Sequence, residues 1–403
     1  MTVRLSELCD LVAEQVHPSD CEDQCVYLGL EHLAPARLIP IASGLATHVN
    51  SHKFRFRRGD VLYGKLRPYL DKAILAATDG VCTTELLVLR PKADVDPKFL
   101  ACVVHAPDFI GHAMAGVTGA HHPRTSWAHI AQFELPNFEE GAQRSIASLL
   151  WQVHDLASEV VKAEESALAV KRAAMRELFT RGLRGEPQKD TEIGPVPESW
   201  SVDTFSDVRE WLQYGTSVHC TLQKKNYPVL RIPNVESGKV NDAELKYCDL
   251  PGKEASKYLL QSGDILFIRT NGVLERLGSC AVYDGQPETA LFASYLIRAR
   301  LKPNIDPRFV AYFYASSLGT SLVADRATPA ADGKYNLNTG TIDSLPLPSP
   351  RTLDEQREIV AILNSIDRKI ELHRQKHAVL EELFKALLRS EEHTSELQSP
   401  NTI

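Results

Sequence analysis

The chain has 403 residues, 43% of them hydrophobic and 24% charged, which is typical of a soluble globular protein and too long for one ordinary core. The formal net charge of −7 argues mildly against a dedicated nucleic-acid binder with a uniformly basic surface. Residues 1–16 lack the apolar centre of a signal sequence, and no apolar run reaches the length of a membrane span. We therefore expect two or three domains, a cytoplasmic location and no membrane partner.

The 8 cysteines are scattered along the chain and form no C-x-x-C pair. Scattered cysteines in a large chain predict reduced thiols rather than a disulfide framework. The same scatter argues against a structural zinc site.

A basic segment with interleaved aromatic residues lies early in the chain, at residues 51–72. Its Lys and Arg side chains outnumber its two acids, Asp60 and Asp71, and Tyr63 and Tyr69 stand among them. A local positive patch with stacking rings can bind phosphates even on an acidic chain. A β-hairpin with a solvated basic face is the alternative explanation, and composition alone favours it over a phosphate-binding patch.

Internal similarity is the strongest signal in the sequence. Residues 58–67 (RGDVLYGKLR) match residues 262–271 (SGDILFIRTN), and residues 5–8 resemble residues 205–208. In each copy Gly-Asp predicts a tight turn, and the apolar run that follows predicts a strand. The chain therefore contains two diverged copies of one globular unit.

A second pair of matching segments lies downstream of each Gly-Asp turn. Asp-Pro at 96–97 and at 306–307 predicts helix starts, with Asp as the N-cap and Pro in the first turn. A Leu-Pro segment then precedes Gln143-Arg144 in the first copy and Gln356-Arg357 in the second. The predicted order is globular unit, long helix, globular unit, long helix.

The long helices are predicted from uninterrupted apolar periodicity. Residues 143–179 contain no proline or glycine, and a helix of this length spans roughly 55 Å. Apolar or small residues recur at a spacing of three then four, which favours two helices packed as an antiparallel coiled coil. A helical hairpin within one domain remains the alternative. The expected stripe of the first helix is Ile146, Leu149, Val153, Leu156, Val160, Ala163, Ala167, Val170 and Ala174. That of the second is Ile359, Ile362, Ile366, Ile370, Leu380, Leu383 and Leu387, interrupted by His373 and Lys376.

These paired motifs resemble the specificity subunits of Type I restriction-modification systems. The family's conserved region is similar to three segments of the second copy: LPLP at 345–348, EQREIVAIL at 355–363 and DRKI at 367–370. The first copy is more degenerate, with AQRSIASLL at 142–150. IGPVPESWSV at 193–202 is similar to the segment that opens a second target-recognition domain. The resemblance covers nearly the whole chain in family order.

One departure from the family pattern lies at the end of the chain. The resemblance implies a second helix that continues through a counterpart of residues 176–182. The chain instead ends with RSEEHTSELQS at 389–399, which looks like the translation of a sequencing-library adapter. We expect residues 389–403 to be a non-native tail without a function.

The resemblance implies an α+β fold with two mixed α/β target-recognition domains in tandem, each followed by a long helix. The expected domains are a first target-recognition domain at 1–138, a central helix at 139–184, a second target-recognition domain at 185–350 and a C-terminal helix at 351–388. The implied function is non-catalytic: each domain reads one half of a split double-stranded DNA site, and the helical rod sets the gap between the halves. Methyltransferase (M) and restriction/translocase (R) subunits would dock on the rod, and they would carry S-adenosylmethionine, ATP and Mg.

Three places are candidates for DNA contact, because Lys and Arg suit guanine edges or phosphates and Asn suits adenine. The residues after the first Gly-Asp turn are Lys65, Arg67 and Tyr69, and those at the matching turn are Arg269, Thr270 and Asn271. The loops before the Leu-Pro segments supply Thr118, His121, His122, Arg124 and Thr125, and in the second copy Lys334, Tyr335 and Asn336. For each residue a solvated loop is the simpler alternative.

Other functions find little support in the sequence. Five histidines between 105 and 129 invite a metal site, but adjacent His121 and His122 cannot easily face one ion. The chain has no P-loop and no G-x-S-x-G elbow, and only a poor match to a methyltransferase Asn-Pro-Pro-aromatic segment at Asn137-Phe138. A coiled-coil scaffold with tandem protein-interaction domains remains the main alternative. A free-standing nuclease or methyltransferase is disfavoured.

Overall fold

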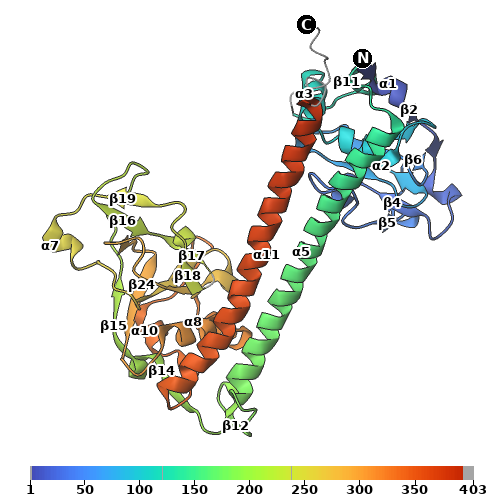
Figure 1. The fold of residues 1–403 in the computed structure, drawn as a ribbon. Coiled ribbons are helices and arrows are strands. Elements are labelled where there is room, and N and C mark those ends of the chain that lie inside the picture. Colours follow the sequence, from blue (N-terminus) through green and yellow to red (C-terminus); the bar gives the residue numbers. More distant parts are fainter. Residues whose placement is uncertain (1, 120, 237, 394–403) are drawn as a thin grey trace. The chain divides into compact units, whose positions relative to one another are not determined.

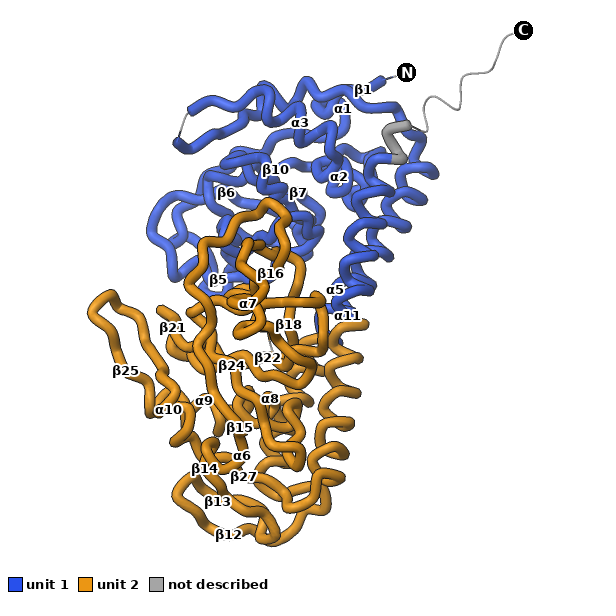
Figure 2. The backbone as a smooth tube through the Cα atoms, turned by 90° about the vertical axis from the view of Figure 1, so that its left-hand side faces the viewer, with its two compact units in different colours: residues 1–163, 373–403 blue, residues 164–372 orange. Residues whose placement is uncertain are grey.

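The computed structural model describes residues 2–119, 121–236 and 238–393, which form two compact units (Figure 2). Unit 1 contains residues 1–163 and 373–403, and unit 2 contains residues 164–372. Across the described ranges, no helix combines the length and the apolar character that crossing a bilayer requires.

The globular part of unit 1 is built on two sheets. One has the strand order β2-β10-β7-β8 and the other β3-β6-β9-β4-β5, while β1 pairs with β11. Its strands are β1 (Thr2–Arg4), β2 (Cys9–Val12), β3 (Gln15–Val16), β4 (Val26–Leu28), β5 (Gly44–Leu45), β6 (Lys53–Phe56), β7 (Val61–Gly64), β8 (Ala73–Leu75), β9 (Gly80–Cys82), β10 (Leu86–Pro91) and β11 (Glu134–Pro136). Its short helices are α1 (Leu5–Leu8), α2 (Pro97–Val103), α3 (Pro107–Ala115) and α4 (Trp127–Ile130).

Unit 2 repeats this plan with insertions. Its largest sheet has the order β15-β24-β20-β22-β18-β17, so that β15-β24-β20-β22 corresponds to β2-β10-β7-β8 of unit 1. The β14–β27 pair corresponds in the same way to β1–β11. Its strands are β12 (Gln188–Thr191), β13 (Gly194–Pro197), β14 (Ser201–Thr204), β15 (Arg209–Tyr214), β16 (Tyr227–Leu230), β17 (Val235–Glu236), β18 (Gly238–Val240), β19 (Lys246–Cys248), β20 (Ile265–Ile268), β21 (Thr270–Asn271), β22 (Cys280–Val282), β23 (Leu291–Phe292), β24 (Leu296–Leu301), β25 (Thr328–Pro329), β26 (Tyr335–Asn336) and β27 (Pro346–Ser349). Its short helices are α6 (Phe205–Val208), α7 (Gly252–Ala255), α8 (Pro307–Ala315), α9 (Ser317–Ala324) and α10 (Thr339–Asp343).

Two long helices, α5 (Glu140–Arg181) and α11 (Leu353–His393), run through both units (Figure 1). Unit 1 contains the start of α5 and the end of α11, whereas unit 2 contains the end of α5 and the start of α11, so the two helices are antiparallel. The mixed α/β fold with two antiparallel long helices, predicted from the repeat, is confirmed.

The same polar contacts tie each long helix to the globular part that precedes it. The carboxylates of Asp96 and Asp306 cap α2 and α8 by accepting backbone N–H groups of the first turn, as the Asp-Pro pattern predicts. The backbone N–H of Asp96 donates to the amide oxygen of buried Gln143 at 3.1 Å, and that of Asp306 donates to the amide oxygen of buried Gln356 at 2.8 Å. The glutamine of each Gln-Arg motif therefore fixes the start of the long helix against the capped helix.

The apolar stripes predicted for the long helices are partly wrong. On α5, Val153, Val160 and Ala167 are buried, but Leu149, Leu156 and Val170 are 44%, 39% and 56% exposed. On α11, Ile362 and Leu383 are exposed in the same way, at 41% and 43%. The seven-residue repeat itself holds, because Val153, Val160 and Ala167 are all buried, but the second position of the repeat is predicted one residue too early. Leu150 and Ala157 are buried instead of Leu149 and Leu156.

Each long helix ends in the core of the other globular part. Met175 and Phe179 of α5 belong to the core cluster of unit 2, and Leu380 and Phe384 of α11 belong to that of unit 1. The sequence KRAAMRELF at 171–179 aligns with KHAVLEELF at 376–384. The segment expected to be missing from the second helix is therefore present up to this point, and the departure begins after it. Of the suspected tail at 389–403, residues 394–403 lie outside the described part of the chain.

Candidate nucleic-acid interface

The two Gly-Asp turns are structural elements held by buried carboxylates. Asp60 accepts the backbone N–H of Arg57 at 2.8 Å and binds the guanidinium of Arg90 through two hydrogen bonds of 2.8 and 2.7 Å. The hydrogen bonds to Asp60 raise the pKa of Arg90. Gly59 adopts a φ of 90°, which the turn requires and which favours glycine. Strand β7 therefore leaves the turn in a fixed direction.

The equivalent turn in unit 2 carries a larger ionic cluster. Asp264 accepts the backbone N–H of Gln261 at 2.8 Å and two hydrogen bonds from Arg300 at 2.8 and 2.9 Å. A second arginine, Arg298, lies 3.7 Å from the same carboxylate and is almost fully buried. Burial lowers the pKa of Arg298 to about 10. Strand β20 is thus held in place like β7.

The first candidate edge forms where the chain leaves β7. The backbone N–H of Lys65 donates to the carbonyl of Glu85, and its carbonyl accepts the N–H of Thr125, both at 3.0 Å. The N–H of Arg67 donates to the carbonyl of Pro123 at 2.7 Å. The structure therefore joins two of the predicted segments, 65–69 and 118–125, which are distant in sequence.

The side chains at this edge differ in their exposure and in their contacts with neighbouring residues. Arg124 binds Glu85 through hydrogen bonds of 2.9 and 3.2 Å, and these contacts raise the pKa of Arg124. Tyr69 is 52% exposed. Arg67 is also exposed, and its backbone adopts a left-handed φ of 52°. Thr125 is buried, and its hydroxyl has no hydrogen-bond partner. Thr118, His121 and His122 are exposed.

The second candidate edge is the equivalent place in unit 2. The backbone N–H of Arg269 donates to the carbonyl of Tyr295 at 3.1 Å, and its carbonyl accepts the N–H of Leu337 at 2.7 Å, which repeats the pattern around Lys65. Beyond Arg269, β21 pairs with β26, placing Thr270 opposite Asn336 and Asn271 opposite Tyr335. Lys65 and Arg269 therefore occupy equivalent positions in the two units.

Aromatic and acidic neighbours at the second edge complete its chemistry. The guanidinium of Arg269 lies 4.9 Å from the ring centroid of Tyr214, and Tyr295 is 58% exposed. Lys334 is exposed and pairs with Asp332 at 2.9 Å, a contact that raises the pKa of Lys334. Sequence reasoning missed Tyr214, Tyr295 and Glu85, because only the three-dimensional pairing of strands brings them to these edges.

Three of the five histidines between 105 and 129, namely His105, His112 and His129, form side-chain hydrogen bonds within the protein. His105 lies 2.6 Å from the carboxylate of Asp71, with its other ring nitrogen 3.1 Å from the carbonyl of Ala73. The rings of His112 and His129 stack at a centroid distance of 4.4 Å. Among the residues that the structure describes, no three His, Cys, Asp or Glu side chains converge as metal ligands would.

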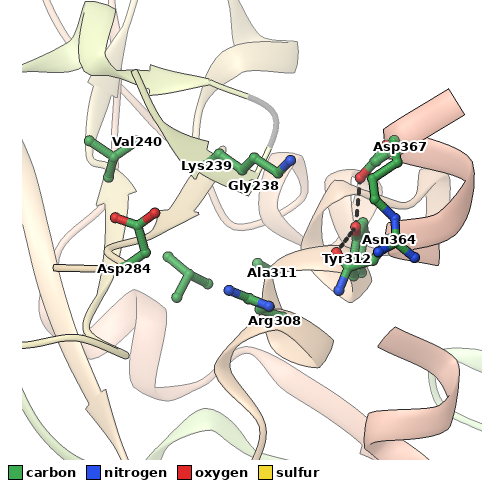
Figure 3. A pocket seen from close by; sticks show the side chains of 11 residues that line it. Gly238, Lys239, Val240, Asp284, Arg308, Ala311, Tyr312, Asn364 and Asp367 are labelled. Atoms are coloured by element: carbon green, nitrogen blue, oxygen red, sulfur yellow. Dashed lines mark hydrogen bonds between the residues drawn. The ribbon is translucent and has the colours of Figure 1, made fainter. Parts of the chain in front are cut away.

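A polar cavity of about 330 Å³ lies elsewhere in unit 2, beside β18, α8 and α11 (Figure 3). Lys239, Arg308 and Asp284 line it on one side. On the other side the hydroxyl of Tyr312 lies between Asn364 and Asp367, at 2.8 and 2.6 Å. None of the predicted DNA-contact residues lines this cavity.

Comparison with known proteins points to a single family. A model described as the Type I restriction modification DNA specificity domain matches residues 197–382. A putative type I restriction enzyme MjaX specificity subunit from Methanocaldococcus jannaschii is 30% identical over 203 residues, which cover 50% of this chain and 47% of that protein. The MjaVIII specificity subunit of the same organism is 26% identical over 324 residues, covering 78% of this chain and 74% of the relative. The Escherichia coli EcoKI specificity subunit is 29% identical over 157 residues, covering 39% and 33%. The chain thus spans about half of the MjaX relative and a third of the EcoKI relative.

Solved structures show the same fold over nearly the whole chain. A structure described as the basis of complex assembly and conformational transition of the type I R-M system matches with a TM-score of 0.59 at 19% identity, covering 97% of both chains. The Type-I restriction-modification system S subunit from M. genitalium matches with a TM-score of 0.58 at 14% identity, covering 97% of this chain and 96% of that one. At these identities the likeness concerns the fold.

Proposed function

The chain belongs to the specificity subunits of Type I restriction-modification systems, and on this premise we propose that it reads a split double-stranded DNA site with two domains. Residues 1–138 and 185–350 would be the two target-recognition domains, each reading one half of the site. The observation that carries the proposal is the repeated edge after the Gly-Asp turn, where Lys65 and Arg269 occupy equivalent positions beside different side chains. Two equivalent edges with different side chains suit two different half-sites.

We propose that the long helices, at 139–184 and 351–388, set the gap between the half-sites. Helix α5 has 42 residues, which corresponds to about 60 Å at 1.5 Å per residue. Successive base pairs lie 3.4 Å apart along the duplex, so a rigid spacer is needed to keep one gap length. A flexible linker between the domains would blur that register.

The predicted contacts divide by chemistry into anchors and readers. Lys65, Arg67 and Arg269 would bind phosphates or guanine edges, and Asn271 and Asn336 could pair with adenine. The exposed ring of Tyr69 and that of Tyr335 would pack against the backbone or the bases. Thr118, His121, His122, Thr270 and Lys334 complete the proposed surface, whereas Thr125 is buried and would not itself contact DNA. Arg124 would contribute as a pair with Glu85, whose carboxylate can also accept from cytosine.

We propose that the long helices also dock the M subunits, with the R subunits joining the same cytoplasmic complex. Leu149 and Leu156 of α5, and Val379 and Leu383 of α11, expose large apolar side chains in unit 1. Exposed apolar residues repeated along a helix mark protein-interaction surfaces. The subunit itself is the non-catalytic component, and S-adenosylmethionine, ATP and Mg belong to the M and R subunits.

The test is long-read detection of methylated bases in DNA from cells that express the chain with a cognate methyltransferase. The expected result is a motif of two short halves around one fixed gap. Absence of any methylated motif from an assembled complex would refute the proposal and leave the scaffold function.

The proposed DNA-binding residues have a matched control in the same basic segment. Replacing Lys65 and Arg67 by Gln should relax or remove one half of the motif only. It should also lower the slope of log affinity against log salt by roughly 0.9 for each phosphate that the variant no longer neutralises. The control replaces exposed Arg57 and Arg58, which precede β7 rather than follow it, and should leave the motif unchanged. Equal effects of the two double variants would refute the assignment of residues.

A further inference from the structure

A partly buried polar network joins three helices of unit 2. Nζ of Lys171 on α5 lies 2.6 Å from Oδ1 of Asp367 on α11, and the two side chains are only 16% and 15% exposed. The hydroxyl of Tyr312 on α8 lies 2.6 Å from Oδ2 of the same carboxylate (Figure 3). A single carboxylate thus holds side chains from both of the other helices.

The hydrogen bonding of this network is complete only in one arrangement. The Tyr312 hydroxyl has one proton, which it donates to Asp367. The amide oxygen of Asn364 lies 2.8 Å from the same hydroxyl, which cannot donate its one proton twice, so an amide turned by 180° would complete the network by donating its NH₂ group to the hydroxyl oxygen. Burial, followed by the hydrogen bond to Asp367, raises the pKa of Tyr312, so the hydroxyl keeps this proton. The ammonium of Lys171 also lies 5.3 Å from the centroid of the Tyr312 ring.

Near Lys171, the apolar residues of α5 are small and do little to lock the helix in position against its neighbours. Ala167 lies one turn before Lys171 and Ala174 nearly one turn after it. Large side chains of α5 enter the core of unit 2 only from Met175 onward, ending with Phe179 between Phe309 and Phe313. Small residues allow two helices to slide or rotate at little cost, whereas a buried polar pair at one position of a helix seam selects a single register.

The other unit shows that the fold does not need this network. With Gln143 aligned to Gln356, Asp367 corresponds to His154 and Asn364 to Trp151; with Asp96 aligned to Asp306, Tyr312 corresponds to Cys102. His154 is buried there, its Nε2 accepting the backbone N–H of Leu38 at 3.3 Å. The two copies therefore build the same place from different chemistry, and the ionic version belongs to unit 2.

We propose that Lys171, Asp367, Tyr312 and Asn364 are positioning residues that fix α5 against α11 and thereby hold the gap of the DNA site to one length. The inference rests on the proposed function. Lys171 selects the register because only one axial and rotational setting of α5 brings its ammonium to the Asp367 carboxylate. Away from that setting, both charges would remain half-buried and unpaired, which is costly.

The experiment compares wild type with Lys171→Met, Asp367→Leu and the double variant, each assembled with the methyltransferase. Each single variant leaves one partner charge unpaired, so its unfolding midpoint should fall by roughly 5–10 °C. The double variant should recover most of this drop, because apolar side chains of similar size replace the pair. Lys369→Met, on an exposed position of α11, is the control and should match wild type.

The decisive readout is the gap of the methylated motif. Wild type should methylate one gap length, and the double variant should methylate motifs one base pair longer or shorter at least about tenfold more than wild type does, which corresponds to 1.4 kcal/mol. A second readout is the distance distribution between spin labels at exposed Val170 and Ile362, which should broaden in the double variant. A folded double variant with the wild-type gap and a narrow distance distribution would overturn the inference. Loss of the motif from wild type itself would instead overturn the proposed function.

Discussion

The two Gly-Asp turns predict unequal costs for removing equivalent carboxylates. Asp60 and Asp264 are both almost fully buried, and each binds an arginine through two hydrogen bonds. Arg90, the partner of Asp60, is 35% exposed and can be hydrated once the carboxylate is gone. Arg298 beside Asp264 is 3% exposed and cannot. An unpaired buried charge costs about 3–5 kcal/mol, whereas removing a hydrogen bond to a charge that water can reach costs about 1.5–3 kcal/mol.

We therefore expect Asp264→Ala to destabilise unit 2 by about 3–5 kcal/mol, and Asp60→Ala to destabilise unit 1 by about 1.5–3 kcal/mol. Hydrogen exchange read by mass spectrometry reports the opening free energies of β20 and β7 separately, so each variant is measured in its own unit. Asp332→Ala, which removes an exposed and solvent-screened ion pair with Lys334, is the control and should leave stability unchanged within the error of the measurement. If Asp60→Ala costs as much as Asp264→Ala, the reasoning from burial of the partner cation is refuted.

Further predictions concern the contacts of the long helices. Gln143→Ala and Gln356→Ala should each cost about 1–3 kcal/mol, because each leaves a backbone N–H at a helix cap without its acceptor, and exchange of the first turn of α2 or α8 measures it. Phe179→Ala and Phe384→Ala should cost about 3–5 kcal/mol in the unit that receives the helix end, and a destabilisation confined to the other unit in either variant would contradict the exchange of helix ends. Burial lowers the pKa of His154, so the unfolded chain takes up a proton at a higher pH than the native chain does. Stability supported by the neutral ring is therefore complete above the unfolded pKa of about 6.5 and falls below it, by up to about 1.4 kcal/mol per pH unit. A His154→Gln variant should lack this component in urea unfolding at pH 7 and 5.5, and identical pH dependence would exclude His154 as its source.

The elements that sequence predicts best are those with local causes. The Asp-Pro caps of α2 and α8 depend on hydrogen bonds between residues that are two and three positions apart, so the residue types alone predict these caps. The absence of proline and glycine from residues 143–179 predicts most of α5, and the Gly-Asp turns predict that β7 and β20 follow them. The tandem order follows because the same local signals occur twice.

What sequence could not predict depends on contacts between distant segments. Arg90 shows no sign in the sequence that it binds Asp60, and Glu85 shows none that it holds Arg124. The predicted helix stripe is misplaced at Leu149 and Leu156 because a two-sided environment, with a partner helix on one side and a globular part on the other, selects the buried face. Periodicity reports that an apolar face exists, but it does not report which neighbour covers it.

The pattern of repetition between the units itself bears on function. The framework contacts are repeated: a capping Asp with a buried Gln, and a Gly-Asp turn with a paired Arg. The edges that these contacts support carry different side chains in the two units. Lys65 of unit 1 occupies the position of Arg269 in unit 2, and the residue whose carbonyl accepts the backbone N–H of each is Glu85 in unit 1 and Tyr295 in unit 2. Packing requirements alone would preserve the framework and place no demand on exposed edges. Different side chains at two equivalent edges, on repeated framework contacts, suit the proposed reading of two different half-sites.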